Sequence, residues 1–149
     1  MLTNDRIKHM IGVAKYMYSH AKEYGVNPDE AFVVGLLHDI GYLYDSWTHE
    51  EQGANLLQSL GFIYHDTVRA HGILPHQVKD KIGVDVEPML ELLFNADLSI
   101  DVTGKEAGKE VGFDHRIENI GKRHGFDSEQ YKNVKILKEE LLKLKEDVE

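Results

Sequence analysis

The chain of 149 residues contains no cysteine and no long apolar run. The lack of cysteine excludes a disulfide framework, a thiolate metal site and a cysteine nucleophile. No apolar segment approaches the length needed to cross a bilayer, and Leu2–Arg6 lacks the basic-then-apolar pattern of a signal peptide. We therefore expect a cytoplasmic protein that does not bind membranes.

Positive charge is also scarce, with 17 basic against 26 acidic residues and a formal net charge of −9. Such a chain is not expected to bind nucleic acid, because non-specific binding needs a basic surface. An acidic protein that binds phosphate would need positive charge near the phosphate, and a bound divalent cation is one way to supply it. Histidine is abundant by contrast, with nine residues.

The hydrophobic residues recur with a helical period, and the β-branched runs typical of a sheet are absent. With 42% apolar and 29% charged residues, the length suits one soluble domain with its own core. We predict an all-α, single-domain bundle of about seven helices over 1–149, with a motif core at 4–101 and C-terminal helices at 114–147. The expected helices span about 4–24, 27–41, 48–61, 64–71, 86–101, 114–124 and 128–147, and the segments 72–85 and 102–113 are expected to be loop-like.

Start signals support several of these helices. Asn27 is a good N-cap, Pro28 suits the first helical position, and Glu30 lies three residues after the cap. Asp127 and Gln130 form a similar pair before the last helix. These signals place the expected helix beginnings at the two positions.

Polar residues interrupt the apolar stripes in four places, one of which is His71, which closes the fourth expected helix directly before a glycine. His9 lies beside the stripe of the first helix, and His38 ends the second helix on its inward face, with Asp39 adjacent. Asp97 shares a helical face with Leu93, four residues earlier. A buried carboxylate without a partner is costly, so it calls for a cation or hydrogen-bond donors. Taken singly, each aspartate is also explained by a cap, a salt bridge or contact with water.

Read together, these residues indicate a metal site. Neutral imidazole and carboxylate groups suit Fe, Mn, Zn or similar divalent ions, and helical bundles build such sites from inward-facing residues. At a helix terminus Asp39 can turn to bridge a second ion, for which His49 and His71 are the obvious further ligands. The candidate metal ligands are His9, His38, Asp39, His49, His71 and Asp97.

The order H…HD…H…H…D, with its surroundings, resembles the HD-domain superfamily of metal-dependent phosphohydrolases over residues 4–101. The segments that carry the resemblance are LLHDIG, HEEQGANLL, VRAHG and NADLS. The resemblance implies an all-α fold and one metal held by His9, His38, Asp39 and Asp97. In dinuclear members of the family, the additional histidines hold a second metal and the aspartate of the HD pair bridges. The resemblance to this family therefore implies one or two divalent metal ions per chain, which are Fe, Mn, Co, Zn or Mg.

The reaction implied by this resemblance is hydrolysis of a phosphomonoester or phosphoanhydride in a nucleotide-like small molecule. Tyr42-Leu43 follows HDIG in place of the Glu-Asp pair of alarmone-hydrolysing relatives, and Gly72 follows His71 in place of the second His of cyclic-dinucleotide relatives. Both of those substrates are therefore less expected. Two alternatives stay open: a di-iron oxygenase on the same scaffold, and a non-catalytic metal- or nucleotide-binding module.

Further roles are assigned to Asp39 and to residues outside the ligand set. Asp39 and His76 are the candidate catalytic residues, with His76 expected on the loop after His71. Asp101 is a candidate to form a hydrogen bond with one of the metal ligands, or to pair with Lys105 one helical turn away. The aromatic residues of 42–47 are candidates for a pocket wall, and the sequence leaves the oligomeric state undecided. The cationic candidates for phosphate contact are Lys79, Lys81, Lys105, Arg116 and Arg123, and no spacing selects among them.

Overall fold

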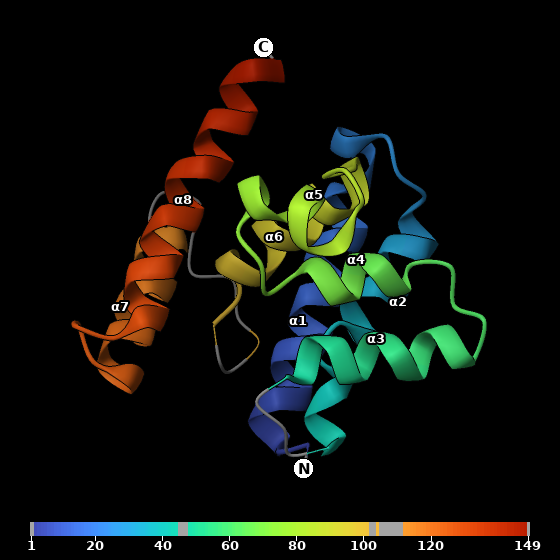
Figure 1. Cartoon of the computed structure of the whole chain (residues 1–149), viewed down its shortest axis with the longest axis horizontal. Helices are drawn as coiled ribbons and strands as arrows, with labels where there is room; N and C mark the ends of the chain where they lie inside the picture. The colour runs from blue at the N-terminus through green and yellow to red at the C-terminus, as the bar shows by residue number, and fades with distance from the viewer. Residues whose placement is uncertain (1, 45–47, 102–103, 105–111, 149) are drawn as a thin grey trace.

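The computed structural model describes residues 2–44, 48–101, 104 and 112–148 (Figure 1). In these ranges the chain forms eight α-helices and two short 3-10 segments and no β-strand, which confirms the all-α prediction. None of the described helices combines the length and apolarity that crossing a bilayer requires. The elements are α1 (Asn4–His20), η1 (Ala21–Tyr24), α2 (Pro28–Leu37), η2 (Ile40–Tyr44), α3 (His49–Ser59), α4 (His65–Ala70), α5 (Pro75–Ile82), α6 (Pro88–Ser99), α7 (Gly112–His124) and α8 (Glu129–Val148).

Helices α1, α2 and α6 share one hydrophobic core, in which Val13, Val34 and Leu93 are fully buried. Gly35 of α2 lies directly against the backbone of Ala14 in α1, where an added Cβ would come within 2.7 Å of the Ala14 Cα. This close approach holds the two helices together, so that residues near their neighbouring ends face the same space.

Helix α2 begins as predicted: the Asn27 side chain accepts a hydrogen bond of 3.0 Å from the Glu30 N–H, and Pro28 occupies the first turn. It ends at Leu37, earlier than the predicted Gly41, and the chain continues into η2. A Cβ at Gly41 would overlap the carbonyl oxygen of His49. The glycine therefore lets η2 and the start of α3 approach closely, next to Asp39.

The prediction of a loop at 72–85 is wrong, because this segment contains α5. Pro75 lies in the first turn of α5, where its missing N–H leaves no helical hydrogen bond unmade. Gly83 caps the C-terminus in the left-handed region, with φ of 85°, and donates its N–H to the Lys79 carbonyl. This additional helix explains why the described residues contain eight α-helices and not about seven.

Helices α7 and α8, orange to red in Figure 1, lie alongside each other and pack on the rest of the chain. Ile117 of α7 and Leu141 of α8 join a second hydrophobic core with Phe94 and Leu98 of α6. Helix α6 therefore contributes to both cores. This arrangement places α7 beside the end of α6 that carries Asp97.

Candidate metal centre

All six predicted ligands come together, although they belong to five different parts of the chain. His9 lies in the middle of α1 and Asp97 near the end of α6, while His49 begins α3. His38 and His71 are the C-cap residues of α2 and α4, and Asp39 follows His38 directly. The six residues form two groups that share Asp39, and the ligand atoms within each group lie within 4.8 Å of one another.

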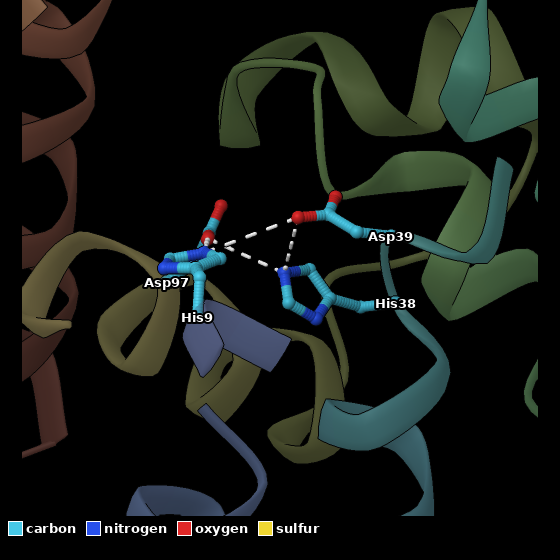
Figure 2. Close-up of side chains that lie close together, drawn as sticks. All are labelled: His9, His38, Asp39 and Asp97. Atoms are coloured by element: carbon cyan, nitrogen blue, oxygen red, sulfur yellow. Dashed lines mark hydrogen bonds and ion pairs between the residues drawn. The ribbon is translucent and has the colours of Figure 1, made fainter. Parts of the chain in front are cut away.

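The first group consists of His9, His38, Asp39 and Asp97, whose side chains converge in Figure 2. The His9 Nε2 atom lies 2.7 Å from Asp97 Oδ1. The His38 Nε2 atom lies 3.2 Å from Asp39 Oδ2 and 3.4 Å from Asp97 Oδ1. Two imidazole nitrogens and two carboxylate oxygens thus surround one small space.

The second group uses the other oxygen of Asp39. Asp39 Oδ1 lies 3.3 Å from the Nε2 atom of His71 and 3.4 Å from the Nε2 atom of His49. One carboxylate therefore presents Oδ2 to the first group and Oδ1 to the second. Each of the two groups thus has one oxygen of Asp39 among its candidate ligand atoms.

Three of the four histidines are oriented by backbone carbonyls. The Nδ1 atom of His9 lies 3.0 Å from the Asp101 carbonyl oxygen, that of His38 lies 2.6 Å from Gly35, and that of His71 lies 2.5 Å from Val68. We assign a proton to each Nδ1, which donates to the carbonyl and leaves the Nε2 lone pair facing the carboxylates. The same orientation is usual for histidines that bind metal ions.

A nitrogen at the middle of the cluster has no conventional partner. His38 is fully buried, and among the described residues its Nε2 makes no hydrogen bond with acceptable geometry. Leaving a buried polar atom unsatisfied is costly, and placing its lone pair beside two carboxylate oxygens adds repulsion. A cation or a proton in this space relieves both penalties, so the donor set fits a divalent ion.

The shifted pKa values of the cluster also indicate that positive charge is favoured in this space. Burial alone would raise the pKa of Asp39, but the charge of the adjacent His38, with help from His49 and His71, holds that pKa well below its ordinary value. Burial likewise opposes the charge on His38, but the Asp39 and Asp97 carboxylates hold its pKa well above the ordinary value. Without a metal, protons on His38 and His71, whose pKa values are both raised by the carboxylates, thus balance the ionised carboxylates.

A pocket of about 250 Å³ opens onto this cluster. Tyr42 of η2 lines it and stacks on His49, with ring centroids 4.0 Å apart. Arg6 covers the other side of the Tyr42 ring and places Nη1 3.0 Å from Asp39 Oδ2. Glu50 also lines the pocket, with Oε1 3.2 Å from the His49 Nε2. Neither Arg6 nor Glu50 was a candidate from the sequence alone, although each lies within three residues of a predicted ligand.

The remaining candidates differ in whether they line this pocket. His76 lies on α5 with its side chain 58% exposed, contacts the Glu140 carboxylate of α8, and does not line the pocket. Lys79 pairs with Asp85 at 3.6 Å, away from the pocket. Arg116 and Arg123 of α7 both line the pocket. Lys105 and the aromatic residue Trp47 lie outside the described residues.

Comparison with known proteins agrees with the ordered motif. The model of the HD domain family matches residues 6–98, more than half of the chain. Searches of curated proteins and of solved structures found no match. The matched segment contains the six clustered residues, and the family is one of metal-dependent phosphohydrolases. The chain belongs to the HD domain family.

Proposed function

We propose that this protein is a phosphohydrolase that uses two divalent ions to hydrolyse a phosphomonoester or phosphoanhydride of a nucleotide-like small molecule. The observation that carries the proposal is the position of Asp39, whose two carboxylate oxygens face two separate groups of imidazoles. A single ion would use only one of these groups. Two ions would use both groups, and Asp39 would serve as a ligand to each ion.

In this proposal His9, His38, Asp39 and Asp97 hold one ion, and Asp39, His49 and His71 hold the other. When bound, such a pair of ions supplies an activated water and neutralises charge on a phosphate group. The three backbone carbonyls behind His9, His38 and His71 keep each Nε2 directed at its ion.

The charge of the occupied cluster suits an anionic substrate. Asp39 and Asp97 contribute two negative charges, so two divalent ions leave the six ligands with an excess of two positive charges. A phosphate dianion matches this excess, even in a chain whose net charge is −9. The cluster thus provides the local positive charge that an acidic phosphohydrolase needs.

The donor set also favours some metals. Four imidazoles and two carboxylates suit Fe, Mn, Co or Zn, whereas Mg²⁺ prefers oxygen ligands and retains several waters. We therefore expect the ion that supports the reaction to be one of these four transition metals, with Mg²⁺ a weaker substitute.

The test is to strip the protein with a chelator, reload it with each metal in turn, and count the ions per chain by elemental analysis. Phosphate release is then measured with a panel of nucleotides and sugar phosphates. The proposal predicts two ions per chain and phosphate release with at least one of Fe, Mn, Co or Zn. Full loading without release from any substrate would contradict it, and oxygen consumption by the iron-loaded protein would instead indicate an oxygenase.

A further inference from the structure

Helix α7 presents a cationic face to the pocket above the metal centre. Arg116, Asn119, Ile120 and Arg123 line that pocket, and their spacing of three, four and seven residues places them on one side of the helix. Ile117 is buried on the core side. The pocket-facing side of α7 thus carries two arginines, two turns apart, with Asn119 and Ile120 between them.

Within the described ranges, Arg116 and Arg123 differ from the other two arginines because they have no acidic partner. Among the residues that the structure describes, Arg6 pairs with Asp39 and Arg69 with Asp66, whereas neither Arg116 nor Arg123 makes an ion pair or a side-chain hydrogen bond. The chain contains 26 acidic residues, so a shortage of carboxylates does not explain why these two guanidinium groups beside the pocket are unpaired. They are available to an anion that enters the pocket.

The space beyond the centre is also larger than one pocket. A second hollow of about 280 Å³ is lined by Thr3, Asp5 and His9 and shares Arg6 and Arg123 with the first. Arg123 therefore stands where the two hollows meet. A substrate whose reacting phosphate lies at the metal centre has room to extend past this arginine.

We propose that Arg116 and Arg123 bind a second phosphate group of the substrate, so that the pocket selects a phosphoanhydride over a simple phosphomonoester. This inference rests on the proposed function and names its substrate class. Arginine suits the role because its planar fork donates two parallel hydrogen bonds to phosphate oxygens. The two guanidinium groups add two positive charges beyond those that the occupied metal centre offers to the reacting phosphate.

The arginines lie outside the segment that the family model matches, which ends at residue 98. The metal ligands therefore belong to the shared core, whereas the cationic face of α7 is contributed by the later part of this chain. The residues that select the substrate would then be different from the residues that carry out its hydrolysis.

The test compares two probes that cannot be hydrolysed, methylphosphonate and methylenediphosphonate, by titration calorimetry on the metal-loaded protein. The variants are Arg116→Gln, Arg123→Gln and the double variant. Lys122→Gln is the matched control, because Lys122 lies on the same helix, pairs with Glu118 and is 67% exposed outside the pocket. Circular dichroism and metal content verify that each variant keeps its fold and its ions.

We expect the wild type to prefer the diphosphonate, and each arginine to contribute about tenfold to that preference, as hydrogen bonds to charged groups do. The double variant should bind both probes about equally, and Lys122→Gln should behave as wild type. Arg116→Lys and Arg123→Lys, which keep the charge but lose the fork, should give intermediate values. Equal binding of the two probes by the wild type, or a preference that survives the double substitution, would overturn the proposal.

These outcomes are independent of turnover. If no substrate releases phosphate but the arginines still determine the diphosphonate preference, the hydrolase proposal fails and the anion site stands. If phosphate is released with the same KM for phosphoanhydrides in the wild type and the double variant, the hydrolase proposal stands and the role of α7 fails.

Discussion

Replacing Asp39 by asparagine tests the two-ion arrangement most severely among single substitutions. Asparagine has the same shape, so packing is preserved, but it carries no charge and offers one carbonyl oxygen in place of two carboxylate oxygens. The Asp39 side chain is only 4% exposed, and its oxygens lie within 3.4 Å of nitrogens from Arg6, His38, His49 and His71. The substitution therefore removes a shared ligand from both proposed ion sites.

The expected loss in metal affinity is at least about 100-fold for each ion, since changing even an outer partner of a metal ligand costs 10–100-fold. In the metal-free protein the substitution removes the carboxylate from a buried ionic cluster, a change that typically costs 3–5 kcal/mol. We expect the lower end, about 3 kcal/mol, because His38 and His71 can release their protons once the carboxylate is gone.

The pH dependence of this cost follows from the shifted pKa values. Asp39, with its lowered pKa, contributes stability that is lost as the pH falls through that pKa, and His38, with its raised pKa, contributes stability that is lost as the pH rises through it. The difference between wild type and Asp39→Asn should be largest between the ordinary pKa values of aspartate and histidine, from about pH 4 to 6.5, and should shrink as the pH rises through the raised pKa of His38.

Chemical denaturation of the metal-free proteins and calorimetric titration with Mn²⁺ or Zn²⁺ measure the two effects. Asp66→Asn is the control: its carboxylate is 39% exposed and pairs with Arg69 on the surface of α4, so a cost below about 1 kcal/mol and unchanged metal binding are expected. An Asp39→Asn protein that binds two ions per chain with wild-type affinity would refute the reasoning.

Four further outcomes are expected. His49→Ala should lose one of two ions and keep the other, and elemental analysis showing unchanged stoichiometry would reduce the centre to one ion. Gly41→Ala should displace the His49 backbone, with the same loss of one ion and a destabilisation of about 1–3 kcal/mol in denaturant unfolding. His76→Ala should keep metal content and phosphate release within about twofold, because a surface change rarely exceeds ±0.5 kcal/mol, and a larger loss of kcat would restore a catalytic role. Metal affinity should increase with pH until the raised pKa of His38 is passed, because binding displaces its proton, and calorimetry in buffers of different ionisation enthalpy should detect that release.

The ligand residues were predictable because each breaks a local pattern. A carboxylate on the apolar face of α6 and a His-Asp pair at the end of α2 are costly unless they meet a cation, and this cost can be seen in the sequence. The sequence could not show that the carbonyls of Gly35, Val68 and Asp101 orient the rings, because every residue offers the same carbonyl group. Asp101 does form a hydrogen bond with the ligand His9, but its backbone carbonyl makes this bond and its carboxylate does not.

Helix boundaries were harder to predict, because proline and glycine have two meanings. Pro75 and Gly83 are typical of loops, yet here they begin and end α5. Asp127 was the expected cap of the last helix, but the Tyr131 N–H donates to the hydroxyl of Ser128, one residue later. Competing caps one residue apart differ by fractions of a kcal/mol, so tertiary packing decides between them.

The role of α7 depends on its position against α6, which no local pattern specifies. The sequence contained several basic residues with no spacing that favoured one, and only the packing of Ile117 into the second core selects the face that carries Arg116 and Arg123. His76 shows the converse case: its place shortly after His71 suggested the site, but α5 directs it toward Glu140. Closeness in sequence does not predict closeness across a helix boundary.

The most direct measurement of the central claim is a crystal structure of the metal-loaded protein, with the ions located and quantified by anomalous scattering. The account predicts two ions per chain, one bound by His9, His38 and Asp97 and the other by His49 and His71, with one oxygen of Asp39 on each. A single ion at full loading, or two ions that do not share Asp39, would contradict it.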